Sequence, residues 1–230
     1  MHNVQNAMFA AALAYNMDVS LEHIRHGLRT FDSTFFQAPG RMNIYDEYPF
    51  KVILDYAHNP AAVRAMCNLV DRFDVIGRKI VVLAAPGDRR DEDINEIADI
   101  AAGHFDYFIC RVDDNRRGRG EDEVARMLEA RLLTAGIDAG SIEVITDEQQ
   151  ATEHALAMAR ADDLVLVLAD NVKRSWKQII YFSADNAEEK PASAIAAHST
   201  LPDTDDFSLA DDLQIISDER GVRIAREEGD

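Results

Sequence analysis

The side chains best suited to chemistry come directly after a short apolar run. Residues 50–54 are apolar but for one lysine, and Asp55, Tyr56, Ala57, His58, Asn59 and Pro60 follow. Polar groups at the carboxyl end of a strand in an open parallel sheet are placed to meet a ligand. The same residues also suit a simple strand-to-helix turn, with Asn59 as the cap and Pro60 at the first helical position. Taken alone, they leave both interpretations open.

Three further polar loops follow predicted strands and favour the first interpretation. They cover residues 86–91 (PGDRRD), 113–117 (DDNRR) and 170–177 (DNVKRSWK). Each loop by itself is more typical of a solvated turn. Loops at one edge of one sheet converge, however, so the four together predict a shared cleft. Its arginines suit phosphate, and its clustered aspartates suit Mg²⁺ or a cationic substrate.

Regular alternation of short apolar runs with helical patterns indicates the fold that positions these loops. The predicted strands are Met42–Tyr45, Phe50–Leu54, Lys79–Ala84, Tyr107–Cys110, Ile142–Ile145 and Leu164–Leu168. The predicted helices between them are Ala61–Arg72, Asp91–Ala102, Asp122–Leu133 and Glu148–Ala159. Repeated βαβ units with right-handed crossovers give an α/β fold, a Rossmann-like doubly wound and mostly parallel sheet of about six strands.

The two ends of the chain differ from this pattern. Residues 2–16 and 20–30 predict two helices, 178–182 an edge strand, 183–204 a flexible linker, and 213–217 with 222–225 a small hairpin. Three regions follow: a helical segment at 1–36, the α/β domain at 37–182, and an acidic, flexible tail at 183–230.

Composition excludes several classes of function. The formal net charge is −18, and half of it lies in the last 48 residues, where thirteen acids face four bases. Such acidity argues against nucleic acid as a partner, although most acidic tails are simply solvated. Two cysteines without metal-ligand spacing predict neither zinc nor a disulfide framework, and so favour the cytoplasm. We find no signal peptide and no apolar stretch long enough for a membrane span.

Some expected catalytic motifs are absent. The sequence has no G-x-x-x-x-G-K-[ST] loop to hold a triphosphate, no hydrolase nucleophile elbow, and no G-x-G-x-x-G opening a helix. We therefore expect the chain to supply half of a site.

Several longer motifs resemble a known family. His2-Asn3-x-x-Asn6 on an Ala-rich helix, residues 39–42 (PGRM) and residues 55–60 (DYAHNP) resemble the end of a Mur ligase central domain running into its C-terminal domain. Residues 31–41, 84–93 and 174–182 are similar to the C-terminal part of the cyanophycin synthetases. The resemblance covers residues 2–182 and leaves out the acidic tail.

The resemblance implies an ATP-dependent amide ligase. ATP phosphorylates an aspartate side chain of a poly-aspartate (cyanophycin) backbone, and L-arginine then displaces phosphate to form the amide. A separate ATP-grasp module adds the aspartates, and Mg²⁺ is held mainly by the P-loop domain. Those domains, in cis or on a separate chain, would be partners of this one. We expect the chain to be inactive alone, and the full enzyme to be a homo-oligomer.

The same resemblance assigns roles to individual side chains. Asn3 would approach the adenine with support from His2 and Asn6, Arg41 would reach the phosphates, and Asp55 would bind the ribose hydroxyls. These roles suit an amide, a guanidinium and a carboxylate.

Further roles concern the reacting groups. His58 would lie near the junction of nucleotide and substrate, as the candidate catalytic residue. The candidate substrate-binding residues are Asp88, Arg89, Asp113, Asp114 and Asn115. The three aspartates are inferred from their chemistry and not carried over from a family motif, since the incoming arginine needs carboxylate partners. We predict no metal ligands in this chain.

Two alternatives stay open. The chain could be the lobe of another Mur-type ligase, acting on a peptidoglycan precursor or on folylpolyglutamate. It could also be a non-catalytic module that binds a nucleotide or arginine.

Overall fold

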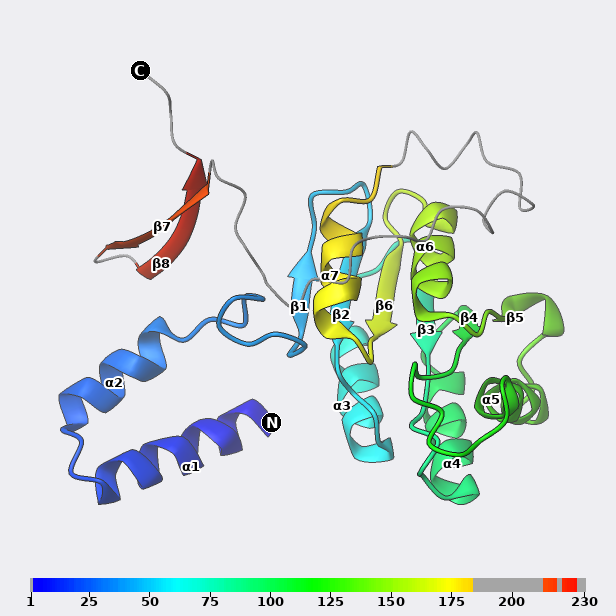
Figure 1. Ribbon diagram of the computed structural model, residues 1–230, viewed down its shortest axis with the longest axis horizontal. Helices are drawn as coiled ribbons and strands as arrows, with labels where there is room; N and C mark the ends of the chain where they lie inside the picture. Colours follow the sequence, from blue (N-terminus) through cyan, green and yellow to red (C-terminus); the bar gives the residue numbers. More distant parts are fainter. Residues whose placement is uncertain (1, 184–212, 219–220, 227–230) are drawn as a thin grey trace. The chain divides into compact units, whose positions relative to one another are not determined.

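A six-stranded sheet forms the centre of the protein (Figure 1). The computed structural model describes residues 2–183, 213–218 and 221–226. The strand order is β1-β2-β6-β3-β4-β5, and only β1 runs antiparallel to its neighbour. The bounds of the strands are β1 (Asn43–Tyr45), β2 (Lys51–Asp55), β3 (Lys79–Leu83), β4 (Tyr107–Cys110), β5 (Ile142–Val144) and β6 (Leu164–Leu168).

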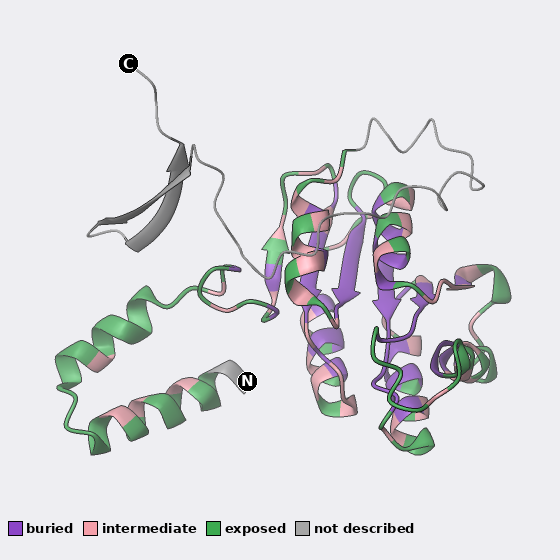
Figure 2. Cartoon of the chain, in the orientation of Figure 1, coloured by how far each residue is buried: buried purple, intermediate pink, exposed green. Residues whose placement is uncertain are grey.

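Helices cover both faces of this sheet, as the predicted doubly wound fold requires. Their bounds are α3 (Pro60–Val70), α4 (Asp91–Ala102), α5 (Glu123–Thr134), α6 (Glu148–Met158) and α7 (Val172–Ile180), with a 3₁₀ turn, η1, at Ala139–Ser141. Alternate strand residues face opposite layers. Ile53 and Val81 pack in one core with α3, α4 and α5, while Val52 and Val82 pack in another with α6 and α7. Figure 2 shows the consequence, since the central strands are buried on both faces.

The structure confirms most of the predicted elements. All six strands lie within one residue of the predicted bounds, and Asn59 caps α3 with Pro60 at its start. The predicted edge strand at 178–182 is wrong, because residues 172–180 form the helix α7. Trp176 of this helix stacks on Phe35 at 5.0 Å, and Ile179 is fully buried.

Residues 3–31, which contain the first two helices except for His2, belong to a different compact unit from residues 32–183. In α1 (His2–Asn16), the side chains of Val4, Met8, Phe9 and Leu13 are each more than 60% exposed. The second helix, α2 (Leu21–Thr30), is capped by Ser20, whose hydroxyl oxygen accepts a hydrogen bond from the His23 amide. Within the described residues, no helix is long and apolar enough to cross a membrane.

Near the C-terminus, β7 (Leu213–Asp218) and β8 (Gly221–Arg226) pair antiparallel, which confirms the predicted hairpin. The predicted linker at 183–204 lies outside the described residues except for Ser183. The predicted region boundaries at 36/37 and 182/183 stay predictions.

Candidate functional site

The four polar loops lie at one edge of the sheet. Strands β2, β3, β4 and β6 are parallel and in register, so the segments that follow them leave the same edge. A small hollow there is lined by side chains from all four loops, among them His58, Pro86, Asp113 and Asp170. The carboxyl ends of parallel strands are where open α/β sheets bind ligands, which makes this edge the candidate site.

Asp55 fastens the 39–42 loop to the end of β2. Its carboxylate is 8% exposed and accepts the Met42 amide at 2.8 Å. Burial raises the pKa of Asp55, although the hydrogen bond from Met42 and the charge of Arg41 oppose it. Arg41 itself is exposed on this loop. The structure thus brings Asp55 and Arg41 together.

The rest of this loop is equally well held. Gly40 has a φ of +69°, and a Cβ there would come within 2.7 Å of Val172 Cγ2. The buried Asn43 side chain accepts the Gly40 amide at 2.7 Å and donates to the Ser33 carbonyl at 2.9 Å. Arg41 therefore projects from a rigid turn.

His58 is half-buried at the same edge. Its Nδ1 lies 2.8 Å from the Tyr56 carbonyl oxygen, and its ring is 4.7 Å from the Tyr56 ring. Because a carbonyl only accepts, Nδ1 carries a proton, and in the neutral imidazole Nε2 is then the acceptor nitrogen. This tautomer suits a proton acceptor or a hydrogen-bond partner for a ligand.

Each aspartate predicted to bind substrate already pairs with an arginine of the chain. The pairs are Asp88–Arg117 at 2.7 Å, Asp113–Arg111 at 3.1 Å and Asp114–Arg174 at 2.8 Å. Asp88 and Asp114 are exposed, so water weakens their pairs and leaves them open to exchange. These carboxylates can accept guanidinium groups, and they hold internal ones in the free chain.

The loops after β3 and β4 are packed against each other. A Cβ at Gly87 would overlap the Arg116 carbonyl oxygen, and Arg119 donates to the carbonyls of Gly87 at 3.0 Å and Arg89 at 2.8 Å. Arg89 is half-buried, and its Nε has no hydrogen-bond partner in the part of the chain that the structure describes. Exposed Asn115 accepts the Arg117 amide at 3.0 Å and shapes the turn.

Two buried charges at this edge were missed by sequence reasoning. Arg111, 1% exposed, pairs with the fully buried Glu148 at 2.8 Å. Both residue types are usually solvated, and Glu148 in the first turn of α6 reads as an ordinary helix-start acid. One feature of the sequence indicated a buried Arg111, because this residue follows the apolar run of β4 directly.

These charges affect the pKa of Asp113. Burial raises the pKa of Asp113, Arg111 opposes this, and the nearby carboxylates Asp170 and Glu148 raise it further. A cation entering the hollow would reduce the electrostatic repulsion among these carboxylates.

The remaining predicted residues lie elsewhere. His2, Asn3 and Asn6 are in the first two turns of α1, and Asn3 and Asn6 belong to the other compact unit. The contacts of all three to adenine stay predictions. Among the described residues, no three His, Cys, Asp or Glu side chains gather to ligate a metal.

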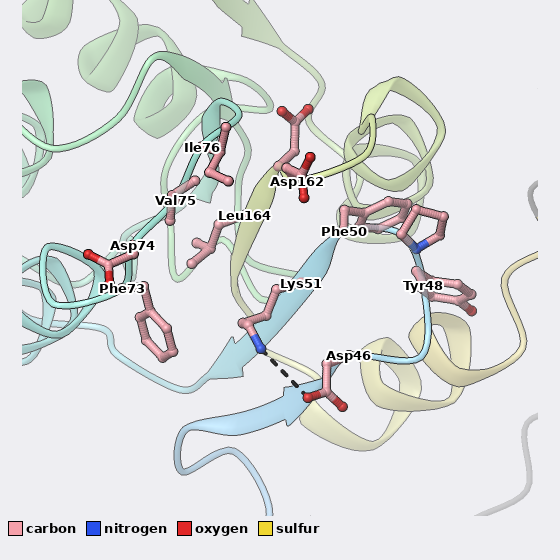
Figure 3. A pocket seen from close by; sticks show the side chains of 12 residues that line it. Asp46, Tyr48, Phe50, Lys51, Phe73, Asp74, Val75, Ile76, Asp162 and Leu164 are labelled. Atoms are coloured by element: carbon pink, nitrogen blue, oxygen red, sulfur yellow. Dashed lines mark ion pairs between the residues drawn. The ribbon is translucent and has the colours of Figure 1, made fainter.

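A second hollow, of about 240 Å³, lies at the opposite edge, where β2 and β6 begin. Figure 3 shows Lys51 paired with Asp46 at 3.6 Å beside the apolar side chains of Phe73, Ile76 and Leu164. It is separate from the four polar loops.

The comparisons with known proteins agree with this architecture. Residues 40–171 match the family model described as Mur ligase, glutamate ligase domain. The chain belongs to this Mur ligase family. The match starts in the Gly40 turn and ends after β6, so it contains the six-stranded sheet, the first three polar loops and the first two residues of the fourth.

Three relatives illustrate the similarity. A cyanophycin synthetase of Nostoc is 40% identical over 176 residues, 76% of this chain and 19% of that protein. A UDP-N-acetylmuramoyl-L-alanyl-D-glutamate–2,6-diaminopimelate ligase of Clostridium acetobutylicum is 27% identical over 169 residues, 72% of this chain and 33% of that one. The solved structure of E. coli FolC in complex with DHPP and ADP is 25% identical, with a TM-score of 0.53, over 70% of this chain and 34% of that one.

These relatives are ligases, and the chain is part of a ligase family. It spans about a fifth of the length of the cyanophycin synthetase that it matches.

Proposed function

We propose that the chain is the C-terminal lobe of a cyanophycin synthetase-like, ATP-dependent amide ligase. The observation that carries the proposal is the 40% identity over 176 residues, against 27% for the diaminopimelate ligase. The cluster of aspartates at the loop edge supports it, because a guanidinium substrate needs carboxylate partners.

The proposed reaction has two steps. ATP transfers its terminal phosphoryl group to an aspartate carboxylate of the polymer, which gives an acyl phosphate and ADP. The amine of L-arginine then attacks the acyl carbon, inorganic phosphate leaves, and the amine gives up a proton as the amide forms. Mg²⁺ would accompany ATP on the P-loop domain.

This lobe would contribute binding and orientation. Arg41 is exposed on its rigid turn and is available to the nucleotide phosphates, next to Asp55 for the ribose. His58 presents Nε2 at the same edge and can accept the proton of the arginine amine. Asp88 and Asp114 would exchange their internal arginines for the substrate guanidinium.

The test is calorimetric titration of the 230-residue chain with L-arginine and with L-citrulline, which has the same shape without the charge. We expect arginine to bind weakly, because it competes with Arg117 and Arg174, and citrulline to bind about tenfold less well. The double substitution Asp88→Asn/Asp114→Asn should abolish the preference, and Asp162→Asn at the opposite edge should leave it unchanged. Equal binding of the two ligands would refute the arginine assignment.

A second titration with Mg-ATP separates the lobe from a stand-alone module. The sequence has no P-loop motif, so we expect little ATP binding. Tight ATP binding that Asp55→Ala removes would instead show a self-sufficient, non-catalytic nucleotide module.

A further inference from the structure

Glu148 makes more contacts at the loop edge than its position suggests. It is the first residue of α6, its side chain is fully buried, and both oxygens are used. One oxygen accepts the Asp170 amide at 2.7 Å and pairs with Arg111 at 2.8 Å. The other accepts the Asn171 amide at 3.1 Å, the Ser175 hydroxyl at 2.7 Å and Arg174 at 3.4 Å.

The two arginines extend this network to Asp113 and Asp114, two of the carboxylates predicted to bind substrate. Arg111 also donates to the Leu168 carbonyl at 2.6 Å and reaches Asp113 at 3.1 Å. Arg174 reaches Asp114 at 2.8 Å. One buried carboxylate therefore fixes the loop after β4 and the turn between β6 and α7 as a single unit.

The charges explain why the carboxylate matters. Arg111 and Arg174 are shared between Glu148 and the two aspartates. Without the charge of Glu148, both guanidinium groups would lose a carboxylate partner, and the loops that carry Asp113 and Asp114 would lose the buried group that fixes them. A buried ion pair is also a poor way to gain stability, since well-packed apolar residues do at least as well.

We propose that Glu148 is a positioning residue: by holding Arg111 and Arg174 it sets the loop that carries Asp113 and Asp114 and the turn that carries Asp170, where the cationic amino acid substrate would bind. The part concerning substrate rests on the proposed function. The part concerning loop geometry does not.

The test compares wild type, Glu148→Gln and Glu148→Gln/Arg111→Met by amide NMR spectra, thermal unfolding, and titration with arginine and citrulline. Glu148→Gln should shift the amide signals of Asp113, Asp114, Asp170 and Asn171, lower the melting temperature, and weaken arginine binding about tenfold with little change for citrulline. The double variant removes both buried charges and should regain most of the melting temperature without regaining arginine binding.

The outcomes separate the two claims. Restored arginine binding in the double variant would mean that the pair is only structural and would overturn the proposal, as would unchanged amide signals at Asp113 and Asp114 in Glu148→Gln. Wild type without a preference for arginine over citrulline would instead refute the proposed function, and the amide signals would still decide whether Glu148 sets the loops.

Discussion

Asp163 gives the most quantitative prediction about stability. It lies at the edge of the sheet opposite the candidate site, just before β6, and is 3% exposed. One carboxylate oxygen accepts the Arg78 amide at 2.6 Å. The other accepts the Arg160 amide at 3.0 Å and the Arg78 guanidinium at 2.8 Å. Asp163→Asn replaces one of these acceptors with an NH₂ group.

The cost follows from the bonds that are lost. If the remaining oxygen faces the Arg78 amide, then the NH₂ group faces two donors and leaves them unpaired. Hydrogen bonds to charged groups contribute about 1.5–3 kcal/mol each, and the part due to the Arg78 side chain is reduced because it is about a third exposed. We expect a loss of about 3 kcal/mol in the free energy of unfolding. With a urea m-value of about 2 kcal/mol/M, the midpoint should fall by about 1.5 M.

The assay is urea unfolding followed by the fluorescence of Trp176, the single tryptophan, which lies against Phe35. Asp162→Asn is the matched control, because Asp162 is exposed and has a φ of 67°, a conformation that asparagine tolerates. Its effect should stay within about 0.5 kcal/mol. If both variants unfold at the same urea concentration, the role assigned to Asp163 is refuted.

The effect should also depend on pH. Burial raises the pKa of Asp163, but the hydrogen bonds from Arg78 and Arg160 outweigh it and hold the pKa below its ordinary value. A depressed carboxyl pKa stabilises the fold above the unfolded pKa, so the gap between wild type and Asp163→Asn should be full at pH 7 and shrink below about pH 4. Asp55 should show the opposite pH dependence. Burial raises its pKa, so its ionised form lowers the free energy of unfolding. This loss should disappear as the pH falls through the raised pKa.

Two other predictions concern the backbone and the thiols. Gly40→Ala should lower the free energy of unfolding by about 2 kcal/mol, because φ is +69° and the new Cβ meets Val172. The control is Gly103→Ala, whose new Cβ would have no heavy atom within 4 Å. It should change the free energy of unfolding by less than about 0.5 kcal/mol in the same urea assay. Burial raises the pKa of both Cys67 and Cys110 to about 12, so Ellman's reagent should label them only as fast as the domain unfolds. Labelling of either thiol at the rate of a free cysteine in the folded protein would contradict this.

The sequence predicted the sheet well because its signal is strong. Parallel strands covered on both faces are continuous apolar runs, and polar helices of about twelve residues separate them. The strand at 178–182 was a misreading of Ile179, Ile180, Tyr181 and Phe182 as an extended apolar run. Val172, Trp176 and Ile179 have helical spacing, and packing against the sheet decides for the helix.

The candidate site was predictable in position but not in pairing. Parallel strands place their following loops at one edge, so the order of residues along the chain was enough to assign Asp55, His58 and Asp113 to a common region. Which arginine meets which aspartate depends on side-chain directions that spacing does not fix. Arg111 and Glu148 escaped notice because buried and solvated charges look the same in a sequence.

The short strands at the two margins of the sheet have a consequence for handling the protein. Both β1 and β5 are three residues long, and β1 runs against its neighbour. Exposed strand margins are the usual starting point for intermolecular β-sheet aggregation, and margins this short offer few backbone groups for it. The sheet of residues 32–183 should therefore resist edge-to-edge aggregation at the concentrations that NMR spectroscopy requires.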